Sequence, residues 1–361
     1  MNCYLIPENI LGRRQIGKMG LSLAPLLFCF ASGLYCQTTS PAAAPSPTPA
    51  QNIAPPVKHY RVRRPLPSTP VAQATAQTVT LVGAGDIVGC ENIAGAMATA
   101  KLIKQIPGTV FAAGDVVYER GTKEEFRDCY GPTWGQFKDR TRPALGNHEY
   151  ITANAAPYFE YWGDKAGPVG KGYYSYDIGA WHIVVLNTNC KAPGVGGCEV
   201  GSAQEVWLKA DLASHANGCI LAYGHHALFS SGLFKSHAVH TEVKPLWDDL
   251  YAVHADLMLA GHEHSYERFA PQNTNGDADP KNGIRLIVAG TGGRSHDPLG
   301  FAAANSEVRN WNTFGVLKLV LAPTSYTWEF IPEEGRTFTD SGSGVCHNAT
   351  PSANPPQSGA N

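Results

Sequence analysis

Side chains that commonly ligate metal ions recur in this chain, each soon after a glycine. An apolar run precedes each glycine, which predicts a buried strand that ends in a tight turn. Carboxylate, amide, phenol and imidazole groups in such turns suit zinc, iron or manganese, and the lack of cysteine among them argues against a closed structural zinc site. The residues in these turns are Asp86, Asp115, Tyr118, Asn147, His148, His225, His226, His262 and His264.

The stretch from residue 110 to 118 is central to this pattern. An apolar run at 110–113 predicts a strand that ends at Gly114, and Asp115 follows, with Tyr118 three residues further on. An aspartate in this position would lie at the carboxyl edge of a sheet, where open α/β folds bind ligands. One Gly-Asp pair is common in ordinary turns, so the recurrence carries the prediction. Five such strand ends predict two adjacent cations about 3.5–4 Å apart, bridged by one aspartate.

Strands and helices that could position these turns alternate along the chain. Apolar runs predict strands at 78–86, 110–118, 219–226, 255–260 and 285–293, and intervening patterns predict helices at 92–106, 122–130, 202–216 and 243–254. Two pairs of segments, 173–177 with 181–187 and 314–321 with 326–331, predict antiparallel strands. Ser202, with Glu205 three residues later, predicts the N-cap of the third helix. No second domain is indicated.

Both ends of the 361-residue chain lack the pattern of a packed core. Residues 1–36 combine paired arginines, an apolar run and small residues at 31–33, which predicts an export signal that resembles a twin-arginine signal. A lipoprotein attached through Cys36 and a retained membrane anchor are the alternatives. Residues 37–76 predict a Pro/Ala-rich disordered linker, and 347–361 predict a disordered tail. A folded domain is expected at 77–346, with no stable membrane span in the mature form.

Charge and cysteine content narrow the class of protein. With 28 basic and 30 acidic residues there is no basic excess, so we expect no nucleic-acid partner; the oligomeric state stays open. Three of the nine cysteines lie in residues 1–36, which leaves an even six for disulfides in an exported domain. Buried free thiols are the alternative. The expected pairs, in order of preference, are Cys190–Cys198, Cys90–Cys129 and Cys219–Cys346.

The order of the motifs resembles a known superfamily. Gly-Asp, Gly-Asp-x-x-Tyr, Gly-Asn-His-Glu, Gly-His and Gly-His-x-His, over residues 80–295, resemble the calcineurin-like metallophosphoesterases. The tyrosine three residues after the second aspartate resembles the purple acid phosphatase branch. The resemblance implies an α/β sandwich in which two packed mixed β-sheets are flanked by α-helices, with residues 77–346 as the catalytic domain.

The resemblance also implies a set of ligands for two metal ions. The residues it assigns to the first metal are Asp86, Asp115, Tyr118 and His264. The residues it assigns to the second are Asp115, Asn147, His225 and His262. Because a phenolate is a hard anionic donor, we expect Fe(III) in the first site, with Fe(II), Zn(II) or Mn(II) in the second.

Two positions depart from the family pattern. His225-His226-Ala227 stands where the family has His-x-Pro, and the alignment makes His225 the ligand and His226 its neighbour. The substrate-pocket histidine has no clean counterpart. The substrate-binding residues that we expect are Asn147, His148, His237 and His240, although the last two could also be merely exposed. His182 and His254 are interpreted as structural histidines.

The implied activity is that of an exported phosphatase. A metal-bound hydroxide would attack a small-molecule phosphate monoester in line, with Asp115 bridging the metals. His148 would protonate the leaving group, with Glu149 or another acid tuning it. A phosphodiesterase or nucleotide hydrolase with the same metals is the nearest alternative. A non-catalytic metal- or phosphate-binding surface protein is a third possibility, against which the intact ligands argue.

Overall fold

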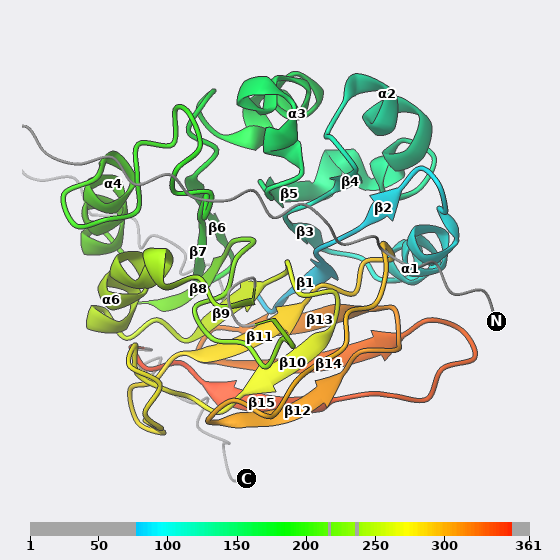
Figure 1. Ribbon diagram of the computed structural model, residues 1–361. Helices are drawn as coiled ribbons and strands as arrows, with labels where there is room; N and C mark the ends of the chain where they lie inside the picture. Colours follow the sequence, from blue (N-terminus) through cyan, green and yellow to red (C-terminus); the bar gives the residue numbers. More distant parts are fainter. Residues whose placement is uncertain (1–76, 216–217, 235–237, 349–361) are drawn as a thin grey trace, which may run out of the picture. The chain divides into compact units, whose positions relative to one another are not determined.

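The computed structural model describes residues 77–215, 218–234 and 238–348. Its strands form two large mixed β-sheets, and helices lie on their outer faces (Figure 1). This arrangement confirms the expected α/β sandwich. The expected export signal and linker, and the tail from residue 349, lie outside the described residues. No helix in the described ranges is both long and apolar enough to cross a bilayer.

The first sheet has six strands in the order β15-β14-β13-β1-β3-β5. Its parallel strands are β1 (Val79–Ala84), β3 (Thr109–Ala113) and β5 (Thr141–Ala144). Its antiparallel strands are β13 (Gly315–Ala322), β14 (Ser325–Pro332) and β15 (Ser341–Val345). Pro143 is tolerated in β5 because this strand lies at the edge of the sheet, where a missing backbone donor leaves no neighbour unpaired.

The second sheet has seven strands in the order β12-β10-β11-β9-β8-β7-β6. Neighbours among β11, β9, β8 and β7 are parallel, and the flanking strands are antiparallel. The strands are β6 (Tyr174–Ile178), β7 (Trp181–Val185), β8 (Cys219–Tyr223), β9 (Leu257–Ala260), β10 (Tyr266–Phe269), β11 (Arg285–Ala289) and β12 (Ser306–Asn310).

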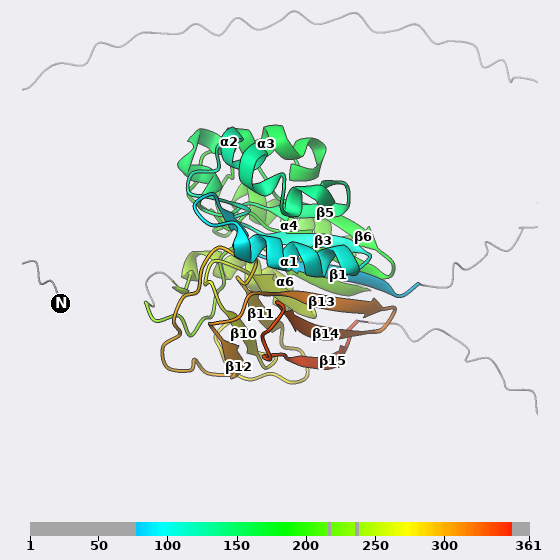
Figure 2. The same ribbon diagram turned by 90° about the vertical axis from the view of Figure 1, so that its right-hand side faces the viewer.

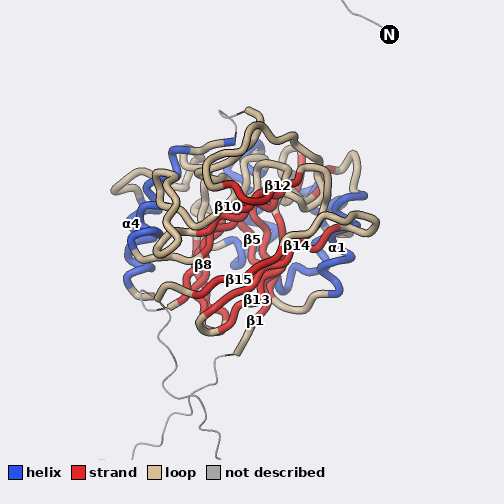
Figure 3. The backbone as a smooth tube through the Cα atoms, turned by 90° about the horizontal axis from the view of Figure 1, so that it is seen from below, coloured by secondary structure: helices blue, strands red, loops and turns tan. Residues whose placement is uncertain are grey.

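The helices cover the outer faces of the two sheets. Seen from below, α1 and α4 lie on opposite sides of the strands (Figure 3), and Figure 2 shows α1 in front of the first sheet. The buried face of α1 includes Ala96, Ala100 and Ile103, and that of α6 includes Leu246 and Trp247. The helices are α1 (Ala94–Gln105), α2 (Lys123–Glu125), α3 (Ala156–Trp162), α4 (Ala203–Ala213) and α6 (Lys244–Ala252).

Apolar side chains between the two sheets form the central core. Leu81 and Phe111 from the first sheet and Leu221 and Leu259 from the second are fully buried in one cluster. Separate clusters pack the helices onto the outer faces, so the parallel strands are apolar on both sides. The continuous apolar runs in the sequence follow from this double burial.

The cap of α4 and a small third sheet are among the details that differ from the sequence expectation. Ser202 caps α4 as predicted, since its Oγ accepts a hydrogen bond from the Glu205 N–H, but the Glu205 carboxylate binds the N–H of Gly201 and not that of Ser202. A small parallel sheet of β2 (Val88–Gly89) and β4 (Val117–Tyr118) was not expected. It pairs Tyr118 with Gly89 and so fixes the tyrosine beside the turn after β1.

Three disulfides confirm the expected pairing of the cysteines. The bridges join Cys90 with Cys129, Cys190 with Cys198, and Cys219 with Cys346. Cys198 and Cys219 are only 1% exposed, so these bridges are part of the packed interior as well as covalent links. Bridges of this kind persist in oxidising compartments.

Candidate metal centre

The five predicted turns lie at the carboxyl ends of β1, β3, β5, β8 and β9. In the first sheet β1, β3 and β5 are parallel neighbours, and in the second β8 and β9 are parallel neighbours. Parallel neighbours present their carboxyl ends at the same edge of a sheet. The turns from both sheets therefore meet, and the structure brings together the predicted side chains of Asp86, Asp115, Tyr118, Asn147, His148, His225, His262 and His264.

Three of these side chains are attached to unusual backbone. The φ angles of Asp86, Asp115 and His262 are 59°, 47° and 72°, in the left-handed region that residues with a Cβ seldom adopt. Such conformations cost on the order of 1–3 kcal/mol each and concentrate at functional sites. Part of the compensation is local: the His262 N–H donates to Asp86 Oδ2 over 2.8 Å.

Glycine before the turns is required by close packing of the strand ends. A Cβ on Gly146 would lie 2.0 Å from Asp115 Oδ1, and one on Gly114 would lie 2.5 Å from His225 Nδ1. Any other residue at either position would displace a candidate ligand. The glycine pattern in the sequence thus reflects the space that the neighbouring ligands occupy.

One group of donor atoms comes from Asp86, Tyr118 and His264. Tyr118 Oη lies 2.7 Å from Asp86 Oδ1 and 3.1 Å from His264 Nε2, and these last two atoms are 3.4 Å apart. His264 Nδ1 is occupied by Ser295 Oγ at 2.5 Å, so Nε2 is the nitrogen that faces the group.

A second group surrounds Nε2 of His225. This atom lies 3.2 Å from Asp115 Oδ2, 3.1 Å from Asn147 Oδ1 and 3.2 Å from His262 Nδ1. His225 Nδ1 lies 2.9 Å from the carbonyl oxygen of Ala113, which can only accept, so Nδ1 carries a hydrogen and Nε2 is the nitrogen available to a metal ion.

These separations suit bound cations. Donor atoms about 2.0–2.2 Å from one metal ion lie about 3 Å from each other in a tetrahedral or octahedral arrangement. Donor atoms of Asp86, Asp115 and His225 also lie within 4.8 Å of one another, so Asp115 is placed between the two groups. A hydrogen of Tyr118 or His225 can join only one pair of these atoms, whereas a metal ion in each group would contact all of its donors, and the residues present therefore fit two metal ions.

The pKa values show how strongly the cluster attracts positive charge. Burial alone would lower the pKa of His225, but Asp115 raises it to about 9. Burial would raise the pKa of Asp115, yet His225 brings it well below its usual range. Burial, Asp115 and Asp86 raise the pKa of Tyr118, so its phenol keeps the proton until a metal ion displaces it.

His148 lies at the border between the metal ligands and the open cleft. Its backbone N–H donates to Asp115 Oδ1 over 2.9 Å, and its ring Nδ1 donates to the Glu119 carbonyl over 2.7 Å. This leaves Nε2, 4.0 Å from Asp115 Oδ2, as the nitrogen available to a ligand in the cleft. The ring also packs on Tyr118, with 4.3 Å between centroids.

Glu149 has a different place from the one we expected. Its buried carboxylate accepts hydrogen bonds from the backbone N–H groups of Asp115, Val116, Val117 and Gly146, at 2.7–3.3 Å. Burial and the nearby Asp115 raise its pKa to about 8. In this geometry Glu149 holds the turn that carries Asp115, and its carboxylate is not hydrogen-bonded to the His148 ring.

A cleft of about 440 Å³ opens beside the ligands. Glu263 and Asp297 form part of its lining, and Leu233, Phe234 and Pro298 form an apolar wall. Leu233 and Phe234 are 51% and 71% exposed, so this wall is accessible from solvent. Its other lining residues are Asp115, Asn147, His148, His262 and His264.

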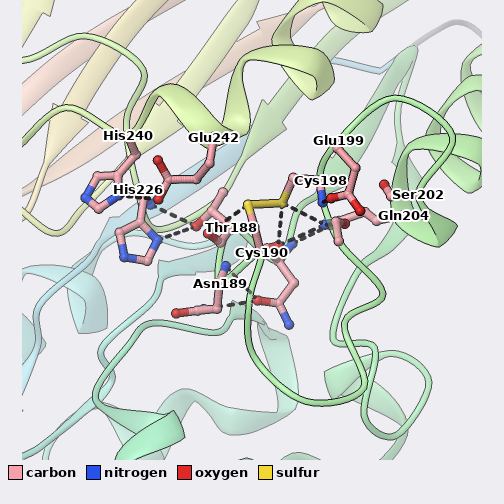
Figure 4. The surroundings of a disulfide bond; sticks show 12 residues. Thr188, Asn189, Cys190, Cys198, Glu199, Ser202, Gln204, His226, His240 and Glu242 are labelled. Atoms are coloured by element: carbon pink, nitrogen blue, oxygen red, sulfur yellow. Dashed lines mark hydrogen bonds and ion pairs between the residues drawn. A yellow bond between two sulfur atoms is a disulfide. The ribbon is translucent and has the colours of Figure 1, made fainter. Parts of the chain in front are cut away.

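His226 and His240 line a separate pocket and are not among the residues that line this cleft. Nδ1 of His226 is 2.8 Å from Thr188 Oγ1, and its ring is 4.2 Å from that of His240 (Figure 4). One donor atom from each of His225, His226 and His262 lies within 4.8 Å of the others, but Nδ1 of His226 already contacts Thr188, which favours His225 as the ligand. His240 is not merely exposed: it pairs with Glu242 and its ring lies 4.9 Å from that of His262. His237 lies outside the described residues.

Thr188 is a supporting residue that the sequence pattern did not predict. Its Oγ1 accepts hydrogen bonds from the backbone N–H groups of both His225 and His226, at 3.2 and 2.9 Å. Thr188 lies two residues before Cys190, and the Cys190–Cys198 bridge closes the loop next to it (Figure 4). The signal for it in the sequence is its position directly after the expected strand at 181–187.

Comparison with known proteins identifies the family to which the chain is similar. A family model for calcineurin-like phosphoesterases matches residues 80–266. The chain is 23% identical to purple acid phosphatase 15 of Arabidopsis thaliana, over 54% of this chain and 41% of the relative. It is 29% identical to human acid phosphatase type 7, over 41% of this chain and 39% of the relative. Probable inactive purple acid phosphatase 9 of Arabidopsis thaliana is 26% identical, over 56% and 36%. The chain thus spans about two fifths of these relatives.

Solved structures agree on the fold. A purple acid phosphatase from yellow lupin seeds superimposes with a TM-score of 0.61 at 20% identity, covering 74% of this chain and 54% of the lupin chain. The GAP50 anchor of the Plasmodium inner membrane complex superimposes with a TM-score of 0.56 at 14% identity, covering 73% of this chain and 88% of the GAP50 chain. With the matched family model and the tyrosine-containing motif, these results show that the chain belongs to the calcineurin-like phosphoesterase family, in its purple acid phosphatase-like branch.

Proposed function

We propose that this protein is an exported phosphatase with a dinuclear metal centre that hydrolyses small-molecule phosphate monoesters. The observation that carries the proposal is the pair of donor groups, about 3 Å between atoms, that share Asp115 at the edge of an open cleft. When bound, two metal ions supply Lewis-acid activation of the phosphoryl group and of a water molecule.

We propose Asp86, Tyr118 and His264 as ligands of one metal and Asn147, His225 and His262 as ligands of the other, with Asp115 shared. The phenol of Tyr118 favours Fe(III) in the first position, and carboxylate, amide and imidazole suit Fe(II), Zn(II) or Mn(II) in the second. Arg294, with its guanidinium carbon 4.9 Å from the Tyr118 ring centroid, places a positive charge against this phenol.

His148 is the proposed general acid. Since its Nδ1 is held by the Glu119 carbonyl, the ring can give a proton only through Nε2, at the cleft. A leaving oxygen within hydrogen-bond reach of that nitrogen would receive the proton as its bond to phosphorus breaks. The N–H of His148 on Asp115 couples the position of the acid to that of the shared ligand.

The cleft supports a monoester over a nucleotide. Leu233, Phe234 and Pro298 offer apolar surface to the organic part of an ester. Asp297 adds a carboxylate to the same lining, which would repel the further phosphates of a nucleoside triphosphate. His240, beside His262, and Asn147 and His148, in the lining, remain the proposed substrate-binding residues, together with His237.

Export is proposed on two grounds. Disulfides persist in oxidising compartments, and the described domain contains three. The paired arginines near the start of the chain favour the twin-arginine route. In this proposal residues 1–36 are the signal, 37–76 the linker, 77–346 the catalytic domain and 347–361 the tail.

The test combines metal analysis with a substrate panel. Purified exported protein should contain two metal ions per chain and hydrolyse aryl and alkyl monophosphates faster than diesters or nucleoside triphosphates over a range of pH. The Asp115→Asn variant should be inactive in the same assay. Faster turnover of diesters or nucleotides would favour the phosphodiesterase or nucleotide hydrolase alternative. Metal-loaded protein that hydrolyses none of them would favour a binding protein.

A further inference from the structure

The segment at residues 290–297, which follows β11, lies against two of the turns that supply ligands to the first metal. The backbone N–H of Arg294 donates to the Asp86 carbonyl over 3.1 Å, and that of Asp297 donates to the His264 carbonyl over the same distance. Asp86 is one of the residues with a left-handed backbone. The segment thus joins the turn after β1 to the turn after β9.

Two side chains of this segment orient the His264 ring. Ser295 Oγ lies 2.5 Å from Nδ1, and Asp297 Oδ2 accepts the backbone N–H of His264 over 3.3 Å. The same carboxylate oxygen lies 3.8 Å from Nδ1. A hydrogen on Nδ1 faces these oxygens, so Nε2 is left to face the donor group. Such partners behind a metal-binding histidine fix the orientation of the ring and raise its basicity.

Arg294 contacts a second ligand, Tyr118. Its guanidinium carbon lies 4.9 Å from the centroid of the phenol ring, and its nitrogens pair with the carboxylates of Glu91 and Glu119. The face of an aromatic ring attracts a cation in this position. The Arg294 side chain is only 20% exposed, so salt and water screen its charge incompletely.

We propose that Arg294 and Ser295 are positioning residues that determine how tightly the first metal is held and how strongly its phenolate donates electrons. Each acts through a ligand, Arg294 through the ring of Tyr118 and Ser295 through that of His264. The segment that carries them contacts all three ligands that the first metal does not share with the second: Asp86, Tyr118 and His264.

The second metal has supports from other elements. Thr188 accepts the backbone N–H of His225, and the carbonyl of Ala113 faces Nδ1 of the same ring. A change in the segment after β11 should therefore weaken the first metal much more than the second. A general loss of structure would weaken both, which separates a positioning role from a merely structural one.

Since this proposal rests on the metal centre of the proposed function, the first experiment measures metal affinity directly. The full chain is loaded with Fe(III) and Zn(II), so that iron reports the first metal and zinc the second during chelator competition. Ser295→Ala should weaken iron binding by about 10- to 100-fold and leave zinc bound, and Ser295→Thr, which keeps a hydroxyl, should restore the affinity. Ser175→Ala is the matched control, because its hydroxyl binds Asp211 and no proposed ligand. It should change neither affinity.

Absorption spectroscopy tests Arg294 independently of stability. Arg294→Gln leaves the carboxylates of Glu91 and Glu119 beside the ring without their counter-charge, which raises the energy of the phenolate electrons. The ligand-to-metal band should therefore move to longer wavelength, whereas Arg294→Lys should keep it near its native position. Arg268→Gln is the matched control, because that guanidinium also pairs with two carboxylates and lies 5.0 Å from an aromatic ring, that of Trp328. It should not move the band.

The outcomes separate this inference from the proposed function. Unchanged iron affinity in Ser295→Ala, or an unchanged band in Arg294→Gln, would overturn the role of that residue and leave the metal centre in place. Equal losses of iron and zinc in Ser295→Ala would overturn its positioning role as well. Native protein that binds neither metal would overturn the metal centre and this inference together. Neither readout uses a substrate, so a lack of phosphatase activity would contradict the proposed function alone.

Discussion

The two histidine–carboxylate clusters of the second sheet use the same chemical groups in different ways. At the carboxyl edge, donors from five strand ends converge on buried positions, and His225 Nε2 faces three other donor atoms at 3.1–3.2 Å. At the amino edge, one hairpin and one helix end supply the groups, and both nitrogens of His182 already face carboxylates. The first cluster brings together more donor atoms than one proton can join, whereas a single protonated imidazole satisfies both carboxylates that face His182 in the second, those of Asp177 and Asp211.

The largest difference between the clusters should appear when one carboxylate is removed from each. Asp115→Ala removes the ligand shared by both donor groups, so we expect loss of bound metal and a fall in hydrolysis of at least about 10³-fold. Asp177→Ala should leave the rate nearly unchanged, because Asp177 pairs with His182 at the amino end of β7, at the edge of the sheet away from the ligands. Bound metal and the initial rate of hydrolysis are measured for both variants. Similar losses of metal and of activity in the two variants would contradict the proposed difference between the two clusters.

The identity of the first metal can be tested through Tyr118. A phenolate bound to Fe(III) gives a visible ligand-to-metal absorption band, which Tyr118→Phe should abolish. Loss of one anionic ligand should also lower the rate by about 10²-fold. Native, iron-loaded protein without such a band would contradict the phenolate–iron proposal, even if the protein is active.

Glu149 tests whether the strained turn at Asp115 depends on a buried acceptor. Glu149→Gln keeps the size of the side chain but turns an NH2 group toward backbone donors that now bind a carboxylate. We expect metal affinity to fall by about 10- to 100-fold, as for other supporting partners of ligands. Competition with a chelator gives the affinity. An unchanged affinity would show that the turn holds Asp115 without help.

Substitution of Thr188 should reduce metal affinity at the candidate metal centre less than substitution of Glu149 does. Thr188→Val conserves shape but leaves the N–H groups of His225 and His226 without their acceptor, at a cost of about 1–3 kcal/mol. We expect about tenfold weaker metal binding. Thr133→Val is the control, because it removes a buried hydroxyl that binds the carbonyl of Cys129 away from the centre. Only the first variant should alter the chelator competition.

The smallest effect concerns the proton at the amino edge. The raised pKa of His182 means that its protonated ring stabilises the fold; this contribution is complete below pH about 6.5 and is lost as pH rises through the folded-state pKa. The pKa of Asp211 is lowered in the fold, so the stabilisation that its carboxylate contributes is lost as pH falls through the folded-state pKa of Asp211. With chelator present, His182→Gln should therefore lower the melting temperature more near pH 6 than near pH 9. An equal difference at both would exclude a stabilising imidazolium.

The sequence predicted the carboxyl-edge cluster because its signals are local. Gly114 and Asp115, or Gly261 and His262, are adjacent in the chain, and each follows an apolar run that ends where the sheet ends. The amino-edge cluster has no such signal. The hairpin pairing of Asp177 with His182 follows from the two expected strands, but the approach of His215 depends on how α4 packs, which periodicity does not determine.

Other parts of the fold and of the site could not be predicted from the sequence for similar reasons. Strands β10, β12 and β15 were not predicted; β12 and β15 lie at the edges of their sheets, where only part of each strand is covered and the apolar alternation is weak. Glu149 was assigned to His148 because the two are neighbours in sequence. In the fold its carboxylate accepts hydrogen bonds from the backbone of Gly146 and from backbone N–H groups more than thirty residues earlier. Sequence proximity is a poor guide to the partner of a buried charge.

The disulfides bear on the timing of biosynthesis. A chain exported through the twin-arginine route would fold, and could take up metal, while its six cysteines are still thiols. Cys198 and Cys219 are 1% exposed in the folded domain, so an oxidant would then have to reach sulfur atoms inside a finished structure. A chain exported unfolded would close the same bridges while its interior is open, and would meet its metals afterwards. The burial of these sulfur atoms thus couples the choice of transporter to the order of oxidation and metal loading.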